Sequence, residues 1–345
     1  MTEHGLAPSS PSGWLPAALN GGHAYRDGVD RAWPSVVGYY AAHYGHSAAS
    51  IWRQRLAAGE ICRNGQRLWA DGPLAAGDQL VWHRPPWWEA AVPVLHQGAI
   101  VFDDGDLLVL DKPSGLPVLP AGGFLRHTLL AQLEALVAGA PRPVHRLGRF
   151  TSGLLVCARR PATRAWLSAQ LRDSTRADAA ASAGSAPCRK LYRALTTPLP
   201  DPWTPGSTET VAWPIGRRPH PLLGEIWCGL SPGQGDGLPA HSRFTLLQRR
   251  PESCLVEVAI ATGRPHQIRI HAACLGAPLL GDPLYGSGGE ARPDALPGAG
   301  GYWLHAHRLE LLRPDGCRLE LEAPPPRELQ QPLDQPRSKA SSREK

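Results

Sequence analysis

Residues 144–158 read VHRLGRFTSGLLVCA, and the two halves of this stretch differ in character. Residues 154–158 form a short apolar run that favours a buried strand, although a helix also fits its periodicity. The stretch therefore predicts a polar loop that leads directly into the core, and loops on rigid scaffolds commonly carry binding and catalytic residues. A surface turn with two solvated arginines is the alternative. The side chains in the first half that can contact a ligand are His145, Arg146, Arg149, Thr151 and Ser152.

Composition limits the class of protein on either side of this stretch. At 345 residues, the chain can form one large domain or two smaller ones with hydrophobic cores. The formal net charge is +6, and nearly all the cations are arginines because lysine stands at only four positions. Arginine contacts phosphates and stacks on bases, which suits a nucleic-acid partner. A GC-rich genome also favours arginine, which accounts for much of the excess of arginine over lysine but not for the net positive charge. An excess of +6 is in itself a weak indication of such a partner.

The sequence indicates neither a metal site nor a membrane segment. The seven cysteines are scattered without a Cys-x-x-Cys pair, so we expect neither a zinc site nor a disulfide framework. His305 and His307 would share a strand face, but no third ligand is evident and packing is the expectation. No run of about 18 apolar residues could span a bilayer, and the N-terminus does not resemble a signal peptide. We therefore expect a cytoplasmic protein without a metal or a membrane partner.

Changes in composition divide the chain into four parts. A leader rich in Gly, Pro and Ser is expected to be loose, and a polar, charged tail is expected to be disordered. Between them, a helix and a small module precede a stiff, proline-rich linker, after which strands and helices of a larger domain are predicted. The parts are the leader (residues 1–24), the helix, module and linker (25–95), the larger domain (96–330) and the tail (331–345).

The central stretch resembles a family signature. The second motif of the RluA-type pseudouridine synthases usually reads His-Arg-Leu-Asp-Arg-x-Thr-Ser-Gly-Leu. Residues 145–154 match its fixed positions with one exception, because Gly148 stands where the family has its catalytic aspartate.

Further segments resemble motifs of the same family, in the family's order. Residues 111–118 read DKPSGLPV, similar to a first motif in which a strand ends in Lys-Pro-Ser-Gly-Leu. Residues 190–194 read KLYRA, similar to Lys-x-Tyr-x-Ala, and residues 263–269 read GRPHQIR, similar to Gly-Arg-x-His-Gln-Ile-Arg. The third motif continues as LLGDPLYG at residues 279–286. Each segment alone could arise by chance, but their common order makes coincidence improbable, and together they cover roughly residues 97–327.

The resemblance implies an α+β fold and an activity on RNA. We expect a mixed, largely antiparallel central sheet with flanking helices, as in pseudouridine synthases, and a small N-terminal basic α/β module. This module resembles an RNA-binding unit shared by a ribosomal small-subunit protein and many pseudouridine synthases; a solvated basic surface is the alternative. The implied activity isomerises uridine to pseudouridine in structured RNA (rRNA or tRNA) by base flipping, glycosidic cleavage and re-attachment at C5. It requires no cofactor, and we expect a monomer.

The same resemblance implies roles for individual side chains. Tyr192 would stack on the base and could help move the C5 proton. Arg269 occupies the position that pairs with the family's aspartate, and Gly148 marks where that aspartate is missing. The residues expected to contact RNA are Lys112, His145, Arg146, Arg149, Arg264 and His266.

Gly148 leaves three interpretations open, because glycine has no side chain that could act as a nucleophile or a base. In the first, Asp111 or Asp282 supplies the carboxylate, since both lie beside family motifs. In the second, the protein is a catalytically inactive RNA-binding relative that acts as an RNA folding or assembly factor. In the third, the reaction follows a route that needs no carboxylate. In each case, Arg269 would require a phosphate or another acid as its partner.

Overall fold

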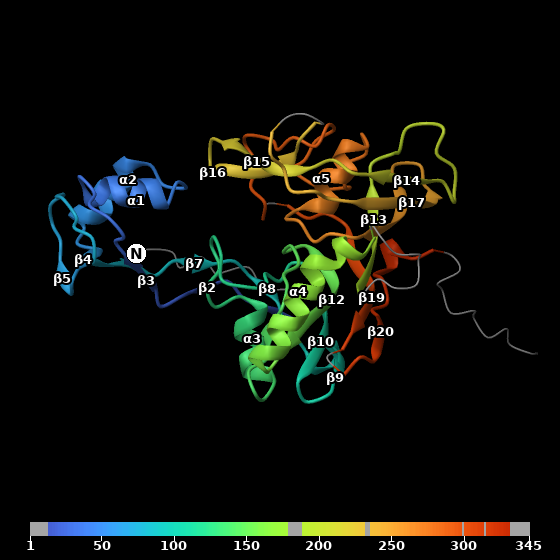
Figure 1. Ribbon diagram of the computed structural model, residues 1–345, viewed down its shortest axis with the longest axis horizontal. Helices are drawn as coiled ribbons and strands as arrows, with labels where there is room; N and C mark the ends of the chain where they lie inside the picture. The colour runs from blue at the N-terminus through green and yellow to red at the C-terminus, as the bar shows by residue number, and fades with distance from the viewer. Residues whose placement is uncertain (1–12, 179–187, 232–234, 299, 314, 332–345) are drawn as a thin grey trace, which may run out of the picture. The chain divides into compact units, whose positions relative to one another are not determined.

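The computed structural model describes residues 13–178, 188–231, 235–298, 300–313 and 315–331, which separate into two compact units (Figure 1). Of the described residues, unit 1 comprises those within 13–92, 121–127 and 219–226, and unit 2 comprises those within 93–120, 128–218 and 227–331. Residues 1–12 of the predicted leader and 332–345 of the predicted tail lie outside the described residues.

The described part of the leader forms short strands. The strands are β1 (Trp14–Leu15), β2 (Ala18–Leu19) and β3 (His23–Gly28), and β2 pairs with β7 (Trp88–Glu89). The Asn20 amide also donates a hydrogen bond to the buried Glu89 carboxylate at 2.7 Å. The loose-leader prediction therefore does not hold for residues 13–24. β1 and β2 have two residues each and are too short for a periodic pattern, so the sequence carried no signal for these two strands.

Unit 1 contains an antiparallel sheet and two packed helices. The sheet has the order β3-β6-β4-β5, with β6 at Gln79–Arg84, β4 at Ile61–Arg63 and β5 at Gln66–Arg67. The β4–β5 hairpin turns at Asn64 and Gly65, which both have positive φ, as the sequence pattern predicts. The helices α1 (Val36–His43) and α2 (Ala49–Ala57) contribute Tyr40 and Trp52, whose rings stack 4.6 Å apart in the core.

The charges of this module nearly cancel. Residues 25–95 contain seven arginines and six carboxylates, which gives a formal net charge of +1. The Arg55 guanidinium lies against the rings of Trp52 and Trp82, at 4.3 and 4.4 Å from their centroids. Arg63 forms an ion pair of 2.9 Å with Asp78. The net charge of this part of the chain is therefore small and positive, and two of its arginines, Arg55 and Arg63, contact aromatic rings and an acid in the fold.

Unit 2 is built on a large mixed sheet. Its strands run in the order β14-β17-β18-β13-β19-β12-β10-β9, with β11 paired to β12 and β20 paired to β19. Their bounds are β9 (Ile100–Asp103), β10 (Leu107–Lys112), β11 (Arg142–Pro143), β12 (Thr151–Ala158), β13 (Cys188–Thr196), β14 (Thr208–Val211), β17 (Ser242–Arg249), β18 (Cys254–Ile260), β19 (Leu304–Leu312) and β20 (Arg318–Glu322). The remaining short elements are β8 (Val92–Pro93), η1 (Gln97–Ala99), β15 (Ile215–His220), β16 (Gly224–Gly229) and η2 (Arg327–Leu329).

A parallel pairing joins two antiparallel parts of this sheet. Thr151–Gly153 of β12 runs parallel to Leu304–Ala306 of β19, whereas the other pairings described in the sheet are antiparallel. Gly153 has a φ of +97°, and a Cβ at this position would collide with the Ala306 carbonyl oxygen. The predicted mixed, largely antiparallel sheet is confirmed, and so is the buried strand predicted for residues 154–158.

Helices flank the sheet of unit 2. The longest, α4 (Pro161–Asp178), packs against β12 and β13, and α5 (Gln267–Cys274) contacts β17 (Figure 1). The third helix, α3 (Leu129–Leu136), begins at Thr128, whose side chain accepts a hydrogen bond from the Ala131 N–H. Within the part of the chain that the structure describes, no helix is both long and apolar enough to cross a membrane.

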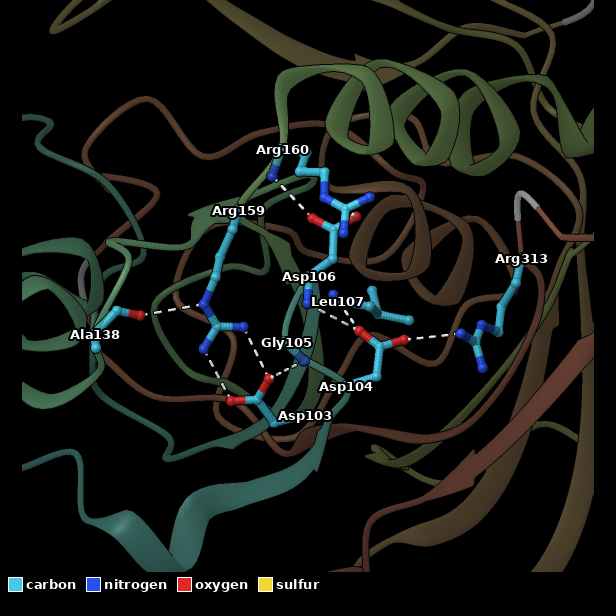
Figure 2. Close-up of polar contacts among 9 residues, drawn as sticks. All are labelled: Asp103, Asp104, Gly105, Asp106, Leu107, Ala138, Arg159, Arg160 and Arg313. Atoms are coloured by element: carbon cyan, nitrogen blue, oxygen red, sulfur yellow. Dashed lines mark hydrogen bonds and ion pairs between the residues drawn. The ribbon is translucent and has the colours of Figure 1, made fainter.

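The aspartates of the acidic turn between β9 and β10 form ion pairs with three arginines (Figure 2). Asp103 accepts two hydrogen bonds from the Arg159 guanidinium, at 2.8 and 2.9 Å. Asp104 forms an ion pair of 3.0 Å with Arg313. Asp106 accepts a hydrogen bond of 2.9 Å from the Arg160 backbone N–H and lies 3.8 Å from its guanidinium. These arginines, which the sequence leaves unassigned, hold the turn in place.

Candidate functional site

A pocket of about 400 Å³ lies in unit 2, at the junction of β12, β13, β19 and α5. Its lining brings together the segments of the second and third motifs and of the Lys-x-Tyr-x-Ala stretch. Among the residues that the structure describes, the lining includes no aspartate or glutamate. The lining residues are Val144, His145, Arg146, Leu147, Gly148, Thr151, Ser168, Leu171, Lys190, Tyr192, Ile260, Gly263, Arg264, His266, Gln267, Ile268, Arg269, Tyr302 and Leu304.

Gly148 lines this pocket directly opposite a tyrosine hydroxyl. A Cβ at residue 148 would collide with Tyr302 Oη and would approach Thr151 Oγ1 to 3.3 Å. Tyr302 is buried, with 4% of its surface exposed, and its hydroxyl lies 3.3 Å from Thr151 Oγ1. The space that a side chain at residue 148 would need is therefore filled by the Tyr302 hydroxyl, which enters from the start of β19.

Arg269 has a carboxylate partner, but one outside the pocket lining. Its Nε and Nη2 donate hydrogen bonds of 2.7 Å to the two oxygens of Asp282, whose side chain is fully buried. Asp282 also accepts a hydrogen bond of 2.9 Å from the Leu284 N–H, which fixes its orientation. The Arg269 guanidinium lies 4.3 Å from the centroid of the Tyr302 ring. The sequence predicted that Arg269 would need a phosphate or another acid as its partner, and Asp282 is that acid. Its oxygens face the guanidinium rather than the pocket.

Tyr192 and Lys190 come from successive inward positions of β13. Tyr192 is buried with 8% of its surface exposed, and it lines the pocket in register with Val258 and Ala306. Burial raises the pKa of its phenol, so the hydroxyl is neutral near neutral pH. The Lys190 ammonium donates a hydrogen bond of 3.0 Å to the Leu171 carbonyl and adds a positive charge to the lining.

The histidines of the pocket are neutral and have assigned tautomers. His145 Nε2 accepts a hydrogen bond of 3.0 Å from the Val156 N–H, so its proton is on Nδ1. Tyr285 donates its hydroxyl proton to the Trp227 carbonyl, so His266 Nδ1 must be the donor in its 2.7 Å contact with Tyr285 Oη. Burial lowers the pKa of both histidines to about 3, and Arg269 contributes to the lowering at His266. Neither ring therefore carries a positive charge to RNA.

Two arginines present their charge to the pocket. Arg146 is exposed, and it has no carboxylate partner among the residues that the structure describes. Arg264 is partly buried, and its Nε donates a hydrogen bond of 2.9 Å to the Pro239 carbonyl. With Lys190, they give the lining a positive charge, which is the environment that a phosphate-bearing ligand requires.

Lys112, Arg149 and Asp111, which the sequence placed in or near the site, do not line the pocket. Lys112 is fully buried, and its ammonium donates hydrogen bonds to the carbonyls of Pro113, Leu116 and Arg149 at 2.8–3.0 Å. Burial lowers the pKa of Lys112 to about 7. The Arg149 guanidinium donates to the Gly115 carbonyl at 3.0 Å, so both cations hold loops together. Burial raises the pKa of Asp111, which pairs with Leu154 between β10 and β12.

Tyr302 is the pocket residue that the sequence did not reveal. It follows the Gly-rich residues 298–301, a composition that predicts a flexible connection, and it lies outside the family motifs. Its place in the site is recognised only from its contact with residue 148, which is more than 150 positions away in the sequence. Lys190 and Thr151 also line the pocket, and both belong to motif segments that could have identified them.

The described residues form no cluster of three or more His, Cys, Asp or Glu side chains that could hold a metal ion. His305 and His307 contact the Ala323 carbonyl oxygen at 3.1 and 2.9 Å. His305 Nδ1 also lies 2.9 Å from Ser152 Oγ. The two histidines thus join β19 to neighbouring backbone and to β12.

Comparisons with known proteins identify relatives of this chain. A family model described as RNA pseudouridylate synthase matches residues 106–274. An uncharacterized RNA pseudouridine synthase of Synechocystis sp. is 41% identical over 301 residues, covering 85% of this chain and 95% of that protein. RNA pseudouridine synthase 5 of Arabidopsis thaliana is 35% identical, covering 85% of this chain and 89% of that protein. Ribosomal large subunit pseudouridine synthase D of Neisseria meningitidis is 31% identical, covering 85% of this chain and 75% of that protein. The chain belongs to the RNA pseudouridine synthases, the isomerase family that its motifs predict.

Proposed function

We propose that this protein isomerises uridine to pseudouridine within structured RNA and that the pocket beside Gly148 receives the flipped nucleotide. The observation that carries the proposal is the gathering of separated motif segments around one pocket with a positive lining. Its volume of about 400 Å³ is within the range of sites that hold one small ligand group. Extracting a base from its stack costs a few kcal/mol, which contacts in the pocket must offset.

The contacts of each side chain support a division of roles. Tyr192 is buried and presents its ring to the pocket, so it is placed to stack on the extruded uracil. Arg146 is exposed at the pocket and is suited to fill the gap left in the RNA or to bind its backbone. Arg264 is suited to a phosphate. Arg269, already neutralised by Asp282, is better suited to hold neighbouring groups than to bind a phosphate.

The RNA class and the cellular setting belong to the same proposal. A relative from Neisseria meningitidis bears the name ribosomal large subunit pseudouridine synthase, which makes rRNA the first substrate to examine and tRNA the second. We propose a monomer that acts in the cytoplasm without a metal or another cofactor. An inactive RNA folding factor is the other candidate, but the named relatives are synthases and do not favour it.

Tritium release from RNA that carries 5-tritiated uridine tests the proposal. Unmodified rRNA and tRNA transcripts serve as substrates, because RNA from cells can already be modified at the target. We expect release above background from at least one transcript, with the modified position then mapped along that RNA. Protein that binds these transcripts but releases no tritium from any of them would support the inactive RNA-binding candidate instead.

A further inference from the structure

The pocket holds one ionisable hydroxyl at the point where the missing aspartate would be needed. Tyr302 Oη takes up the space of a side chain at Gly148 and contacts Thr151 Oγ1. The Arg269 guanidinium lies 4.3 Å from the centre of the same ring. The bidentate pairing with Asp282 keeps that guanidinium in place. Tyr302 is therefore oriented by a hydroxyl and by a fixed cation, an arrangement suited to a proton-transfer group.

We propose that Tyr302 is a catalytic residue that carries the proton transferred in the isomerisation, in place of the carboxylate that Gly148 cannot supply. This inference rests on the proposed function, because it assigns a chemical role within that reaction. Conversion of uridine to pseudouridine removes one proton from C5 and adds one to N1, so the net proton count is unchanged. A single residue that donates a proton and later accepts one can therefore complete the reaction without a co-reactant.

The steps balance as follows. When the N1–C1′ bond breaks, its electron pair stays on the uracil, and the Tyr302 hydroxyl gives its proton to N1. The uracil turns so that C5 occupies the former position of N1, and a C5 electron pair forms the bond to C1′. The Tyr302 phenolate then takes the C5 proton and returns to a neutral phenol. The phenol and phenolate act beside the same carbon atom of the sugar, so one fixed hydroxyl can serve both steps.

The surroundings of Tyr302 suit both protonation states. Burial raises the pKa of the phenol, which keeps the proton on Tyr302 before the reaction. Arg269 acts in the opposite direction and favours the phenolate once the proton has left. Other groups are less suitable: the pocket histidines have a pKa of about 3, and Asp111 and Asp282 do not line the pocket.

Tyr302→Phe tests the inference because it removes one oxygen and keeps the ring that packs on Arg269. We expect kcat for tritium release to fall by about 10²–10⁴-fold, the usual range for general acid–base catalysis, with KM for the RNA unchanged. Tyr40→Phe is the matched control, because Tyr40 is a fully buried tyrosine in unit 1, outside the pocket. We expect this control to keep the kcat of the unchanged protein.

A second readout depends on geometry. Gly148→Ala introduces a Cβ that collides with Tyr302 Oη, whereas the next atom of that ring is 3.5 Å away. We expect Gly148→Ala to lower kcat in the unchanged protein and to add little in the Tyr302→Phe background. A double-mutant cycle measures this coupling. Equal losses in both backgrounds would overturn the placement of Tyr302 beside residue 148.

The outcomes separate this inference from the proposed function. If the unchanged protein releases no tritium from rRNA or tRNA transcripts, both the function and the role of Tyr302 are overturned. If the unchanged protein is active and Tyr302→Phe keeps its kcat, the function stands and the role of Tyr302 is overturned. A loss of kcat with unchanged KM and an unchanged thermal midpoint supports the role.

Discussion

Two regions of unit 2 use arginine in opposite ways. At the acidic turn (Figure 2), Arg159, Arg160 and Arg313 each meet an aspartate of residues 103–106. At the pocket, the lining contains cations but no described carboxylate, and Arg269 finds its acid behind the lining. Cations that meet acids hold a turn, whereas cations in a lining without a described carboxylate leave room for a polyanion. The position of acids around the arginines, more than the number of arginines, separates structural from functional charge in this protein.

The largest expected difference between the two regions is in how much the free energy of unfolding falls when an aspartate is replaced by asparagine. Asp282→Asn leaves the Arg269 guanidinium buried without a charge partner, so we expect the free energy of unfolding to fall by about 3–5 kcal/mol. Asp103→Asn is the matched control, because it breaks a bidentate pair of similar geometry that is partly exposed. We expect a loss of about 1 kcal/mol or less for this control. Urea denaturation measures both, and equal losses would contradict the distinction.

A smaller difference concerns pH. The unfolded chain protonates His266 below its ordinary pKa of 6.5, but the folded protein does so only near pH 3. The unfolded state therefore binds more protons in this window, and the free energy of unfolding falls as the pH decreases from 6.5. Between pH 7 and pH 5, His266 should account for a loss of about 2 kcal/mol.

Urea denaturation at pH 7 and pH 5 measures this effect. His266→Asn, which suits the left-handed backbone at this residue, should make the loss about 2 kcal/mol smaller than in the unchanged protein. At the acidic turn, Arg159 holds the pKa of Asp103 below its ordinary value of 3.8. The stabilisation by Asp103 is therefore present above that value and is lost only at lower pH. An unchanged pH dependence in His266→Asn would mean that the fold does not lower the pKa of His266, which would contradict the prediction.

The smallest expected effect concerns RNA affinity. Arg146→Ala removes an exposed cation of the pocket, so we expect RNA binding to weaken by about tenfold, or 1.4 kcal/mol. Arg160→Ala is the control, because this arginine is also exposed but lies next to Asp106 at the acidic turn. Binding measured across a series of salt concentrations should lose about one unit of slope in the first variant and none in the second. Equal effects would mean that RNA contacts both regions.

The sequence predicted the assembly of the pocket better than the contacts inside it. The segments around His145, Tyr192 and Arg269 were identified by an apolar run and by their resemblance to family motifs, and a mixed sheet brings them together. Lys112 and Arg149 were expected to contact RNA because their segments resemble the family motifs. Their partners are backbone carbonyls, and no sequence pattern records where a carbonyl of a distant loop will point.

The part of the site around Gly148 was harder to predict, for a related reason. In the sequence, Gly148 indicates only that a functional side chain is absent. In the structure, the space that such a side chain would need is occupied by Tyr302 Oη. Such replacement across a sheet depends on the parallel pairing of β12 and β19, which joins residues more than 150 positions apart. Asp282 was a reasonable candidate for a catalytic acid because of its motif, but in the fold its carboxylate faces Arg269.

The close approach of Gly148 to Tyr302 also couples the residue types that these two positions accept. With Tyr302 in its present place, a Cβ at residue 148 would collide with its hydroxyl oxygen, so the ring would have to move before residue 148 could carry a side chain. The two positions are therefore expected to vary together among sequences, with a residue that lacks the phenol hydroxyl at position 302 wherever residue 148 is larger than glycine.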